Sequence, residues 1–189
     1  MKHTHSLNLA FVGVLALFLA VSMLTACGGG DPNEKEAKAL VKKNMESELK
    51  YDAPSAVVRA FFEALGAGKT QVAESFVEPD NLQIARNYIN LTCKKAEVDS
   101  AWIAPLSYVW SDGNKAAVDY GLNKRMSFMG EENLIMEHEN VLLVKNNEGV
   151  WKLRFENKGS QYATSIPDDI NEQNDKHLGD DKDKYTVKL

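Results

Sequence analysis

The chain has 189 residues and a formal net charge of −5, and without residues 1–26, whose only charge is Lys2, that charge is −6. A length of this order suits one domain with tethers. The acidic pI of about 5.4 excludes the basic footprint that nucleic acid binding needs, so no nucleic acid partner is expected.

The first 26 residues predict a secretory signal peptide. A positive charge at Lys2 precedes an apolar run from Leu9 to Leu24, and small residues end the run. The sequence Leu-Thr-Ala-Cys that closes it, residues 24–27, resembles the lipobox of bacterial lipoproteins. In that motif the cysteine thiol takes a diacylglycerol and a peptidase cuts directly before the cysteine. The resemblance implies that residues 1–26 are removed and that Cys27 carries acyl chains such as palmitate.

The alternative interpretation of this run is an uncleaved transmembrane helix, because Leu7 to Leu24 is just long enough to span a bilayer. No basic cluster follows the run, however, whereas Cys27 and three glycines do. Each buried methylene of an acyl chain contributes about 0.8 kcal/mol, so two or three chains hold a protein at the membrane stably. We expect a lipid-anchored protein of the bacterial cell envelope. In a Gram-negative host, Gly28 favours the periplasmic face of the outer membrane.

The cysteine count excludes a disulfide scaffold. The chain has only Cys27 and Cys93, and acylation of the first leaves the second without an intramolecular partner. Cys93 has no second metal ligand nearby in sequence. We therefore interpret it as a small buried apolar residue rather than a reactive or metal-binding thiol.

Residues 27–51 predict a tether followed by a charged helical spacer. The turn-rich run 28–33 is flexible in composition, and residues 34–50 are good helix formers. A narrow apolar stripe recurs at every fourth position of the spacer: Ala37, Val41, Met45 and Leu49. Such a stripe packs on its own domain or belongs to a solvated spacer, and the alternative is a surface that binds a partner.

The domain itself is expected over residues 52–158 and opens with three helices. Asp52 caps the first helix and Pro54 occupies its first turn, where a missing N–H costs nothing. One broad apolar face of this helix comprises Val57, Val58, Phe61, Phe62 and Leu65. Shorter helices are predicted near residues 72–76 and from 82 to about 91.

The hydrophobic period then changes to two, which predicts antiparallel strands. We expect strands near residues 106–110, 115–123, 134–145 and 151–155, joined by turns at 111–114, 130–133 and 146–149. Tyr120 shares the core face of its strand with Val118 and Leu122, so Asp119 is predicted to face solvent. Helices followed by a meander predict an α+β fold with the N-terminal helices packed on one face of a curved antiparallel β-sheet.

Two stretches carry a further resemblance. Residues 56–65 and the closing Gly149–Leu153 are similar to the first helix and last strand of the nuclear transport factor 2-like superfamily. The resemblance covers about residues 52–158. It implies a cystatin-like cone, in which a long bent sheet wraps round the first helix and leaves a wide end that can hold a pocket.

The same resemblance raises an enzymatic alternative, a lipid-tethered small-molecule enzyme of the ketosteroid isomerase or polyketide cyclase type. These enzymes place an acid–base carboxylate beside hydroxyl donors inside the cone. The candidate residues are Asp119, Tyr120, Tyr108, Glu137, His138 and Glu139. Neighbours on a strand point to opposite faces, so residues 137–139 cannot all reach one metal ion. We expect no catalytic residue, metal or cofactor, and interpret the domain as a non-catalytic module that binds a protein partner or a small apolar ligand.

The last segment, residues 159–189, is expected to be an acidic, largely disordered tail. Its carboxylates lack the glycine and the ligand spacing of a calcium loop. Residues 185–189 alternate well enough to add a strand to a sheet edge, in this chain or in a partner.

Overall fold

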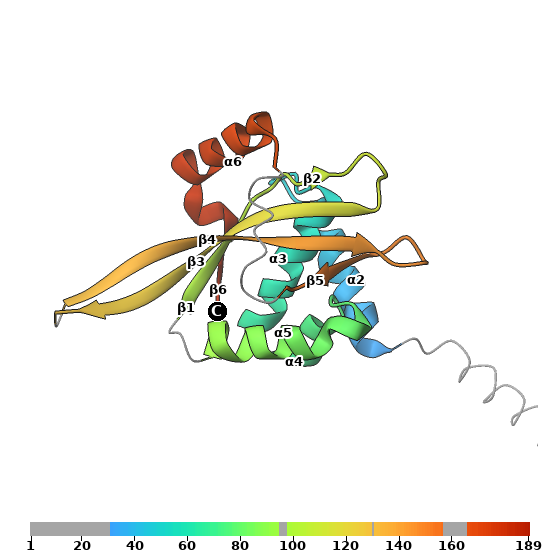
Figure 1. Ribbon diagram of the computed structural model, residues 1–189, viewed down its shortest axis with the longest axis horizontal. Coiled ribbons are helices and arrows are strands. Elements are labelled where there is room, and N and C mark those ends of the chain that lie inside the picture. Colours follow the sequence, from blue (N-terminus) through green and yellow to red (C-terminus); the bar gives the residue numbers. More distant parts are fainter. Residues whose placement is uncertain (1–30, 95–97, 130, 157–165) are drawn as a thin grey trace, which may run out of the picture.

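The computed structural model describes residues 31–94, 98–129, 131–156 and 166–189. It is an α+β fold with a strongly curled antiparallel sheet and helices on both of its sides (Figure 1). The N-terminal elements are α2 (Pro32–Met45), α3 (Ala53–Gly66), α4 (Thr70–Glu74), η1 (Pro79–Asn81), α5 (Leu82–Tyr88) and the π-helix η2 (Ile89–Lys94). The strands are β1 (Val98–Ile103), β2 (Tyr108–Val109), β3 (Lys115–Phe128), β4 (Glu131–Lys145) and β5 (Trp151–Arg154), followed by α6 (Asp168–Asp180), η4 (Lys182–Tyr185) and β6 (Thr186–Lys188).

The sheet has the strand order β5-β4-β3-β1-β6, and β2 adds to β3. Its main feature is the β3–β4 hairpin, which pairs from Lys115 with Val144 to Phe128 with Glu131. Figure 1 shows the far end of this hairpin extending well past the helices. The large apolar side chains exposed there include Met126, Leu134 and Ile135.

Helix α3 fills the inner side of the sheet and forms as its sequence predicts. The Asp52 carboxylate accepts a hydrogen bond from the Ser55 N–H at 2.9 Å, and Pro54 lies in the first turn. On the predicted face Val57, Val58, Phe61 and Phe62 are buried and Leu65 is partly buried, and the face belongs to the same core as the inner side chains of the strands. Capping and burial therefore act together to fix this helix.

The hairpin before β5 also forms where expected. The Asn146 side-chain oxygen accepts hydrogen bonds from the Glu148 N–H at 3.0 Å and the Val150 N–H at 2.9 Å. Gly149 has a φ of 75°, a conformation that favours glycine. The turn sets the register of β5, and the alternating residues Trp151, Leu153 and Phe155 are buried.

Several boundaries differ from the predicted ones. Strand β1 was not predicted, although it pairs with β3 and is largely buried. The third helix ends at Tyr88 and continues as η2. Strand β2 has only two residues, and the β3–β4 strands reach to Phe128 and Glu131, so this turn is tighter than expected.

The prediction of a largely disordered C-terminal tail is wrong for residues 166–189, which form α6, η4 and β6. The Asn174 side chain of α6 donates to the Leu106 carbonyl at 3.0 Å and accepts from the Leu106 N–H at 3.4 Å. Strand β6 pairs with β1 of the same chain, which confirms the edge-strand prediction. Gly66 permits this pairing, since a Cβ there would lie 2.1 Å from the Lys188 carbonyl oxygen.

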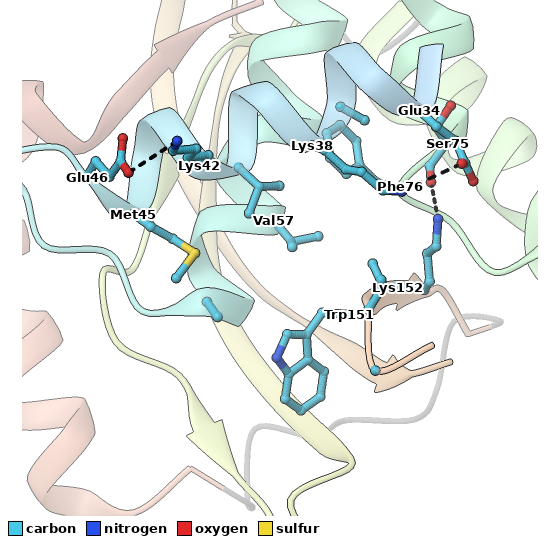
Figure 2. Close-up of a pocket in the computed structure, with 15 residues that line it drawn as sticks. Glu34, Lys38, Lys42, Met45, Glu46, Val57, Ser75, Phe76, Trp151 and Lys152 are labelled. Atoms are coloured by element: carbon cyan, nitrogen blue, oxygen red, sulfur yellow. Dashed lines mark hydrogen bonds and ion pairs between the residues drawn. The ribbon is translucent and has the colours of Figure 1, made fainter. Parts of the chain in front are cut away.

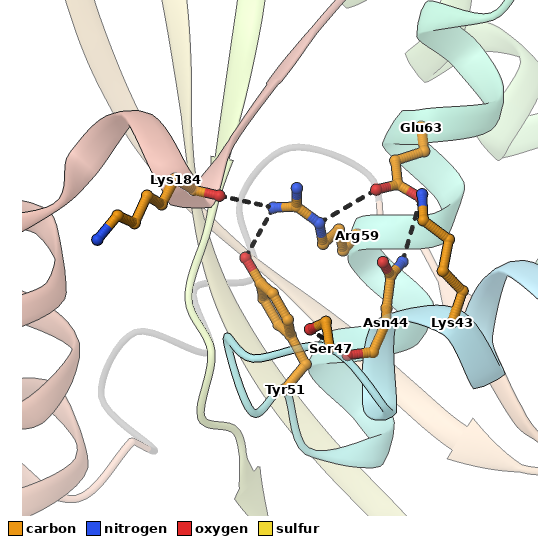
Figure 3. Close-up of polar contacts among 7 residues, drawn as sticks. All are labelled: Lys43, Asn44, Ser47, Tyr51, Arg59, Glu63 and Lys184. Atoms are coloured by element: carbon orange, nitrogen blue, oxygen red, sulfur yellow. Dashed lines mark hydrogen bonds and ion pairs between the residues drawn. The ribbon is translucent and has the colours of Figure 1, made fainter.

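The folded body is therefore larger than residues 52–158, and one polar network shows why (Figure 3). Arg59 of α3 donates to the Tyr51 hydroxyl at 2.8 Å, to the Lys184 carbonyl at 3.5 Å and to Glu63 at 3.2 Å. Glu63 accepts a hydrogen bond from Asn44 of α2 at 3.2 Å. Burial raises the pKa of Tyr51 to about 12, so its hydroxyl stays protonated. The network joins the expected spacer and the expected tail to α3, and the described core runs from Ala37 to Val187.

The predicted signal peptide, the lipobox and Cys27 lie outside the described residues. Within the described part, no helix is both long and apolar enough to cross a bilayer.

Candidate functional site

A groove of about 380 Å³ lies between α2 and the start of β5 (Figure 2). Met45 and Glu46 lie at one end, and Glu34, Ser75 and Lys152 lie together at the other. The apolar residues that line it are Ala37, Val41, Met45, Ala53, Val57, Phe76, Val150 and Trp151. The arrangement is an apolar slot with charged side chains along its rim.

One wall of the groove is the apolar stripe of α2. Ala37 is buried in the core, whereas Val41 is half-buried and the Met45 side chain stays 47% exposed. Residues four apart share one face of a helix, so these three side chains follow the same line. The stripe packs on its own domain at one end, as the favoured interpretation had it, and is open toward the groove at the other.

The facing wall comes from residues distant in sequence. Trp151 begins β5 and is only 9% exposed, and Phe76 follows α4 and belongs to the core. The Lys145 ammonium lies 4.7 Å from the centre of the Trp151 ring, where a cation–π contact holds the indole in place. Lys152 donates to the Ser75 carbonyl at 2.6 Å. The groove is therefore closed by contacts between α2, the end of α4 and the β4–β5 turn.

The charges on α2 at the rim are paired with one another. Lys38 lies 4.0 Å from Glu34, and Lys42 lies 3.8 Å from Glu46. All four side chains are at least half exposed, and ion pairs of this kind contribute little to stability. These ion pairs keep the rim of the groove hydrated, whereas the side chains on its floor are uncharged.

A separate polar cluster lies on the inner face of the sheet and joins two of the sequence candidates. Tyr120 on β3 is directly opposite Glu139 on β4, and its hydroxyl donates to the Glu139 carboxylate. Tyr88, which ends α5, places its hydroxyl 2.8 Å from that of Tyr120 and donates to Glu139 at 3.4 Å. The sequence predicted Tyr120 on a core face with Val118 and Leu122 and did not single out Tyr88; the structure places both hydroxyls beside the Glu139 carboxylate.

The chemistry of this cluster is that of a satisfied hydrogen-bond network. Burial, with smaller contributions from Tyr88 and Glu139, raises the pKa of Tyr120 well above its ordinary value, so the phenol stays protonated. The Tyr88 ring stacks on Phe155 with centroids 4.6 Å apart. None of Tyr88, Tyr120 and Glu139 lines the groove.

Asp119 and His138 meet on the opposite face of the sheet. Asp119 was predicted to face solvent, but its side chain is only 22% exposed, because α6 lies over this face. The His138 Nδ1 atom lies 3.6 Å from the carboxylate, and the His138 side chain is 47% exposed. Burial raises the pKa of Asp119 to about 6; His138 and the Tyr120 backbone N–H oppose the rise, and Asp175 of α6 adds to it.

The raised pKa of Asp119 predicts that the contribution of this carboxyl group to stability falls as pH rises. The folded protein keeps a proton that the unfolded chain releases near its ordinary value of 3.8. The stabilisation is fully present below that value and is lost as pH rises through about 6. A difference of this size between the folded and unfolded pKa values corresponds to about 2 to 3 kcal/mol in the free energy of unfolding. Asp119→Asn should remove most of this slope when urea unfolding is measured between pH 4 and 7.5.

The matched control is Asp99→Asn, which removes a carboxylate on the neighbouring strand that pairs at the surface with Arg125 at 2.9 Å. This variant should keep the downward slope. A difference in stability between wild type and Asp119→Asn that stays constant from pH 4 to 7.5 would contradict the placement of Asp119 beneath α6.

The remaining candidates do not join a common site. Glu137 forms an ion pair with Lys124, and the Tyr108 ring lies 5.1 Å from that of Trp110 at the short strand β2. Among the described residues, no group of three or more histidine, cysteine, aspartate or glutamate side chains is placed to hold a metal ion. The prediction for the Cys93 thiol lies outside the described side chains, as that for Cys27 does.

Comparisons with known proteins leave the family open. No protein-family model matches the chain, and no curated protein matches it. The chain is similar to the solution structure of a SEC-C motif containing protein from Rhodopseudomonas palustris, with 15% sequence identity and a TM-score of 0.40. The match covers 70% of this chain and 96% of the other. A likeness of this size carries no argument about fold family or function.

Proposed function

We propose that this protein is a lipid-anchored lipoprotein of the bacterial envelope whose folded domain binds a small apolar ligand in the groove. The N-terminal pattern that ends at Cys27 supports the anchor. The curled sheet with α3 on its inner side is consistent with a nuclear transport factor 2-like cone, which stays part of the proposal. The domain performs no chemistry and needs no cofactor.

The groove is the observation that carries the binding function. Its volume of about 380 Å³ lies within the range of small-molecule sites, which are mostly apolar with few polar groups. Partly exposed apolar side chains such as Met45 and Val41 gain stability when a ligand covers them.

The enzymatic alternative rests on the cluster of Tyr88, Tyr120 and Glu139. A carboxylate beside two hydroxyl donors can act as a general acid or base when a substrate can reach it. Here both hydroxyls are already hydrogen-bonded within the cluster, and Tyr120 is fully buried. The contacts therefore favour a structural role for these residues over catalysis.

Two variants of α2, each of which adds one carboxylate, test the binding function. Met45→Glu places a carboxylate in the groove, whereas Ala39→Glu adds the same charge to an exposed position of the same helix that does not line it. The soluble chain 28–189, which contains the whole described core, is titrated with a fluorescent apolar probe such as anilinonaphthalene sulfonate. Met45→Glu should weaken binding at least tenfold, and Ala39→Glu should bind as wild type.

Equal binding by both variants would place the probe outside the groove. If the wild-type chain did not bind the probe, this result would contradict the proposed function itself.

A further inference from the structure

We propose that the ligand is a fatty acid with one acyl chain, bound with its chain along α2 and its carboxylate at Lys152. This inference rests on the proposed function and names the ligand class of the same groove.

The shape of the groove favours a single chain over a protein partner. A stable protein interface buries about 800 Å² on each partner. Among the large apolar side chains that line the groove, Met45 alone is strongly exposed in the described structure. The apolar floor from Ala37 to Met45 spans eight residues of helix, or about 12 Å. A narrow slot of this length suits an extended hydrocarbon chain.

The charges place the head group at one end. Lys38 and Lys42 are paired with carboxylates along α2. Lys152 is half-buried, and within the described residues its ammonium donates to the Ser75 carbonyl without a carboxylate in ion-pair reach. An ammonium has three donors, so two remain for a ligand. A carboxylate bound there gains a charge-assisted hydrogen bond in a partly desolvated site.

The helix direction supports the same orientation. Glu34 lies in the first turn of α2, so this end of the groove is near the positive end of the helix dipole. The Glu34 carboxylate itself is directed to Lys38 in the ion pair at 4.0 Å. At the other end Met45 offers apolar contact for the end of the chain, and the charges of Lys42 and Glu46 there are paired with each other.

The proposed lipid anchor indicates where the fatty acid would come from. Residues 28–31 separate Cys27 from the start of α2, and four residues span at most about 14 Å. Acyl chains on Cys27 would therefore hold the Lys152 end of the groove close to the bilayer surface. Long-chain carboxylates partition into that surface, so we take the membrane as the source of the fatty acid.

The test separates the head group from the chain. Laurate, lauryl alcohol and a lauroyl lysophosphatidylcholine are titrated against the soluble chain 28–189 by calorimetry, below their micellar concentrations. Laurate should bind at least tenfold more tightly than the other two. Lys152→Met keeps the aliphatic stem and should weaken laurate about tenfold, the size of one charge-assisted hydrogen bond. Lys152→Arg should restore most of the affinity, and Lys35→Met, at an exposed position of α2 that does not line the groove, should leave it unchanged.

The outcomes distinguish the two proposals. Equal affinities for laurate and lauryl alcohol, or a Lys152→Met variant that binds laurate normally, would overturn the carboxylate site while leaving the groove as the binding site. Tighter binding of the lysolipid would overturn the fatty acid as ligand. Failure of all three to bind, in a chain with a normal cooperative melt, would overturn the proposed function as well.

Discussion

Cys27→Ser is expected to leave an uncleaved precursor that carries no acyl chain. The lipobox resemblance assigns the diacylglycerol to the Cys27 thiol, and a serine hydroxyl cannot form that thioether. Cells fed a labelled palmitate analogue should label the wild-type protein and not the variant. The variant should also run at a higher mass, because residues 1–26 remain attached.

The matched control is Cys93→Ser, which removes the other cysteine and should be processed and labelled normally. In a Gram-negative host the labelled protein should fractionate with the outer membrane. Labelling that survives in Cys27→Ser would show that the anchor is wrongly placed.

Trp151→Ala should lower the free energy of unfolding by about 3 kcal/mol, the lower end of the range for a buried tryptophan. The indole is 9% exposed, and one part of it lines the groove, so it has fewer packing partners than a ring in the centre of the core. Its loss also removes the contact with the Lys145 ammonium. Urea unfolding of the soluble chain 28–189 measures the difference.

Trp110→Ala is the matched control, because that ring is half-buried at the short β2–β3 turn. It should cost less than about 1 kcal/mol, as substitutions near the surface do. A cost for Trp151→Ala below that of the control would mean that β5 has a different register.

Local signals made α3 and β5 predictable. The cap at Asp52 and the broad apolar face of α3 depend on residues within one helix, and all are present in the structure. The alternation of Trp151, Leu153 and Phe155 follows from a turn that its own residues determine. Where neighbours in sequence decide a structure, the pattern was sufficient.

The C-terminal segment was not predictable from its own residues. Helix α6 is polar along most of its length, so composition indicated disorder. It is held instead by contacts with distant backbone, as between Asn174 and Leu106. Burial of Asp119 follows from the same helix, and the prediction that this carboxylate faces solvent failed for that reason.

The position of one turn explains why the polar cluster was missed. A β3–β4 turn at residues 130–133 places Tyr120 opposite a residue well beyond Glu139. The actual turn lies between Phe128 and Glu131, and this register brings Tyr120 and Glu139 together. A shift of a few residues thus changes which side chains meet across the strands.

Of the two walls of the groove, only the apolar stripe on α2 is recognisable in the sequence. The stripe at Ala37, Val41 and Met45 is visible in the sequence, where packing on its own domain or a solvated spacer was favoured and a surface for a partner was the alternative. The opposite wall requires Phe76 and Trp151, which the fold brings to α2 from two separate elements. No local pattern specifies that approach, so the slot emerges only in the folded chain.

The most direct test of the account is to locate a bound fatty acid in the protein. The soluble chain 28–189 is irradiated with a laurate analogue that carries a diazirine near the end of its chain, and the labelled peptides are identified by mass spectrometry. The account predicts that the label falls on α2 near Val41 and Met45, or on β5 at Trp151, and that excess laurate suppresses it. Label on the β3–β4 hairpin tip around Met126 and Ile135, or beside Tyr88, with none in the groove would contradict the account.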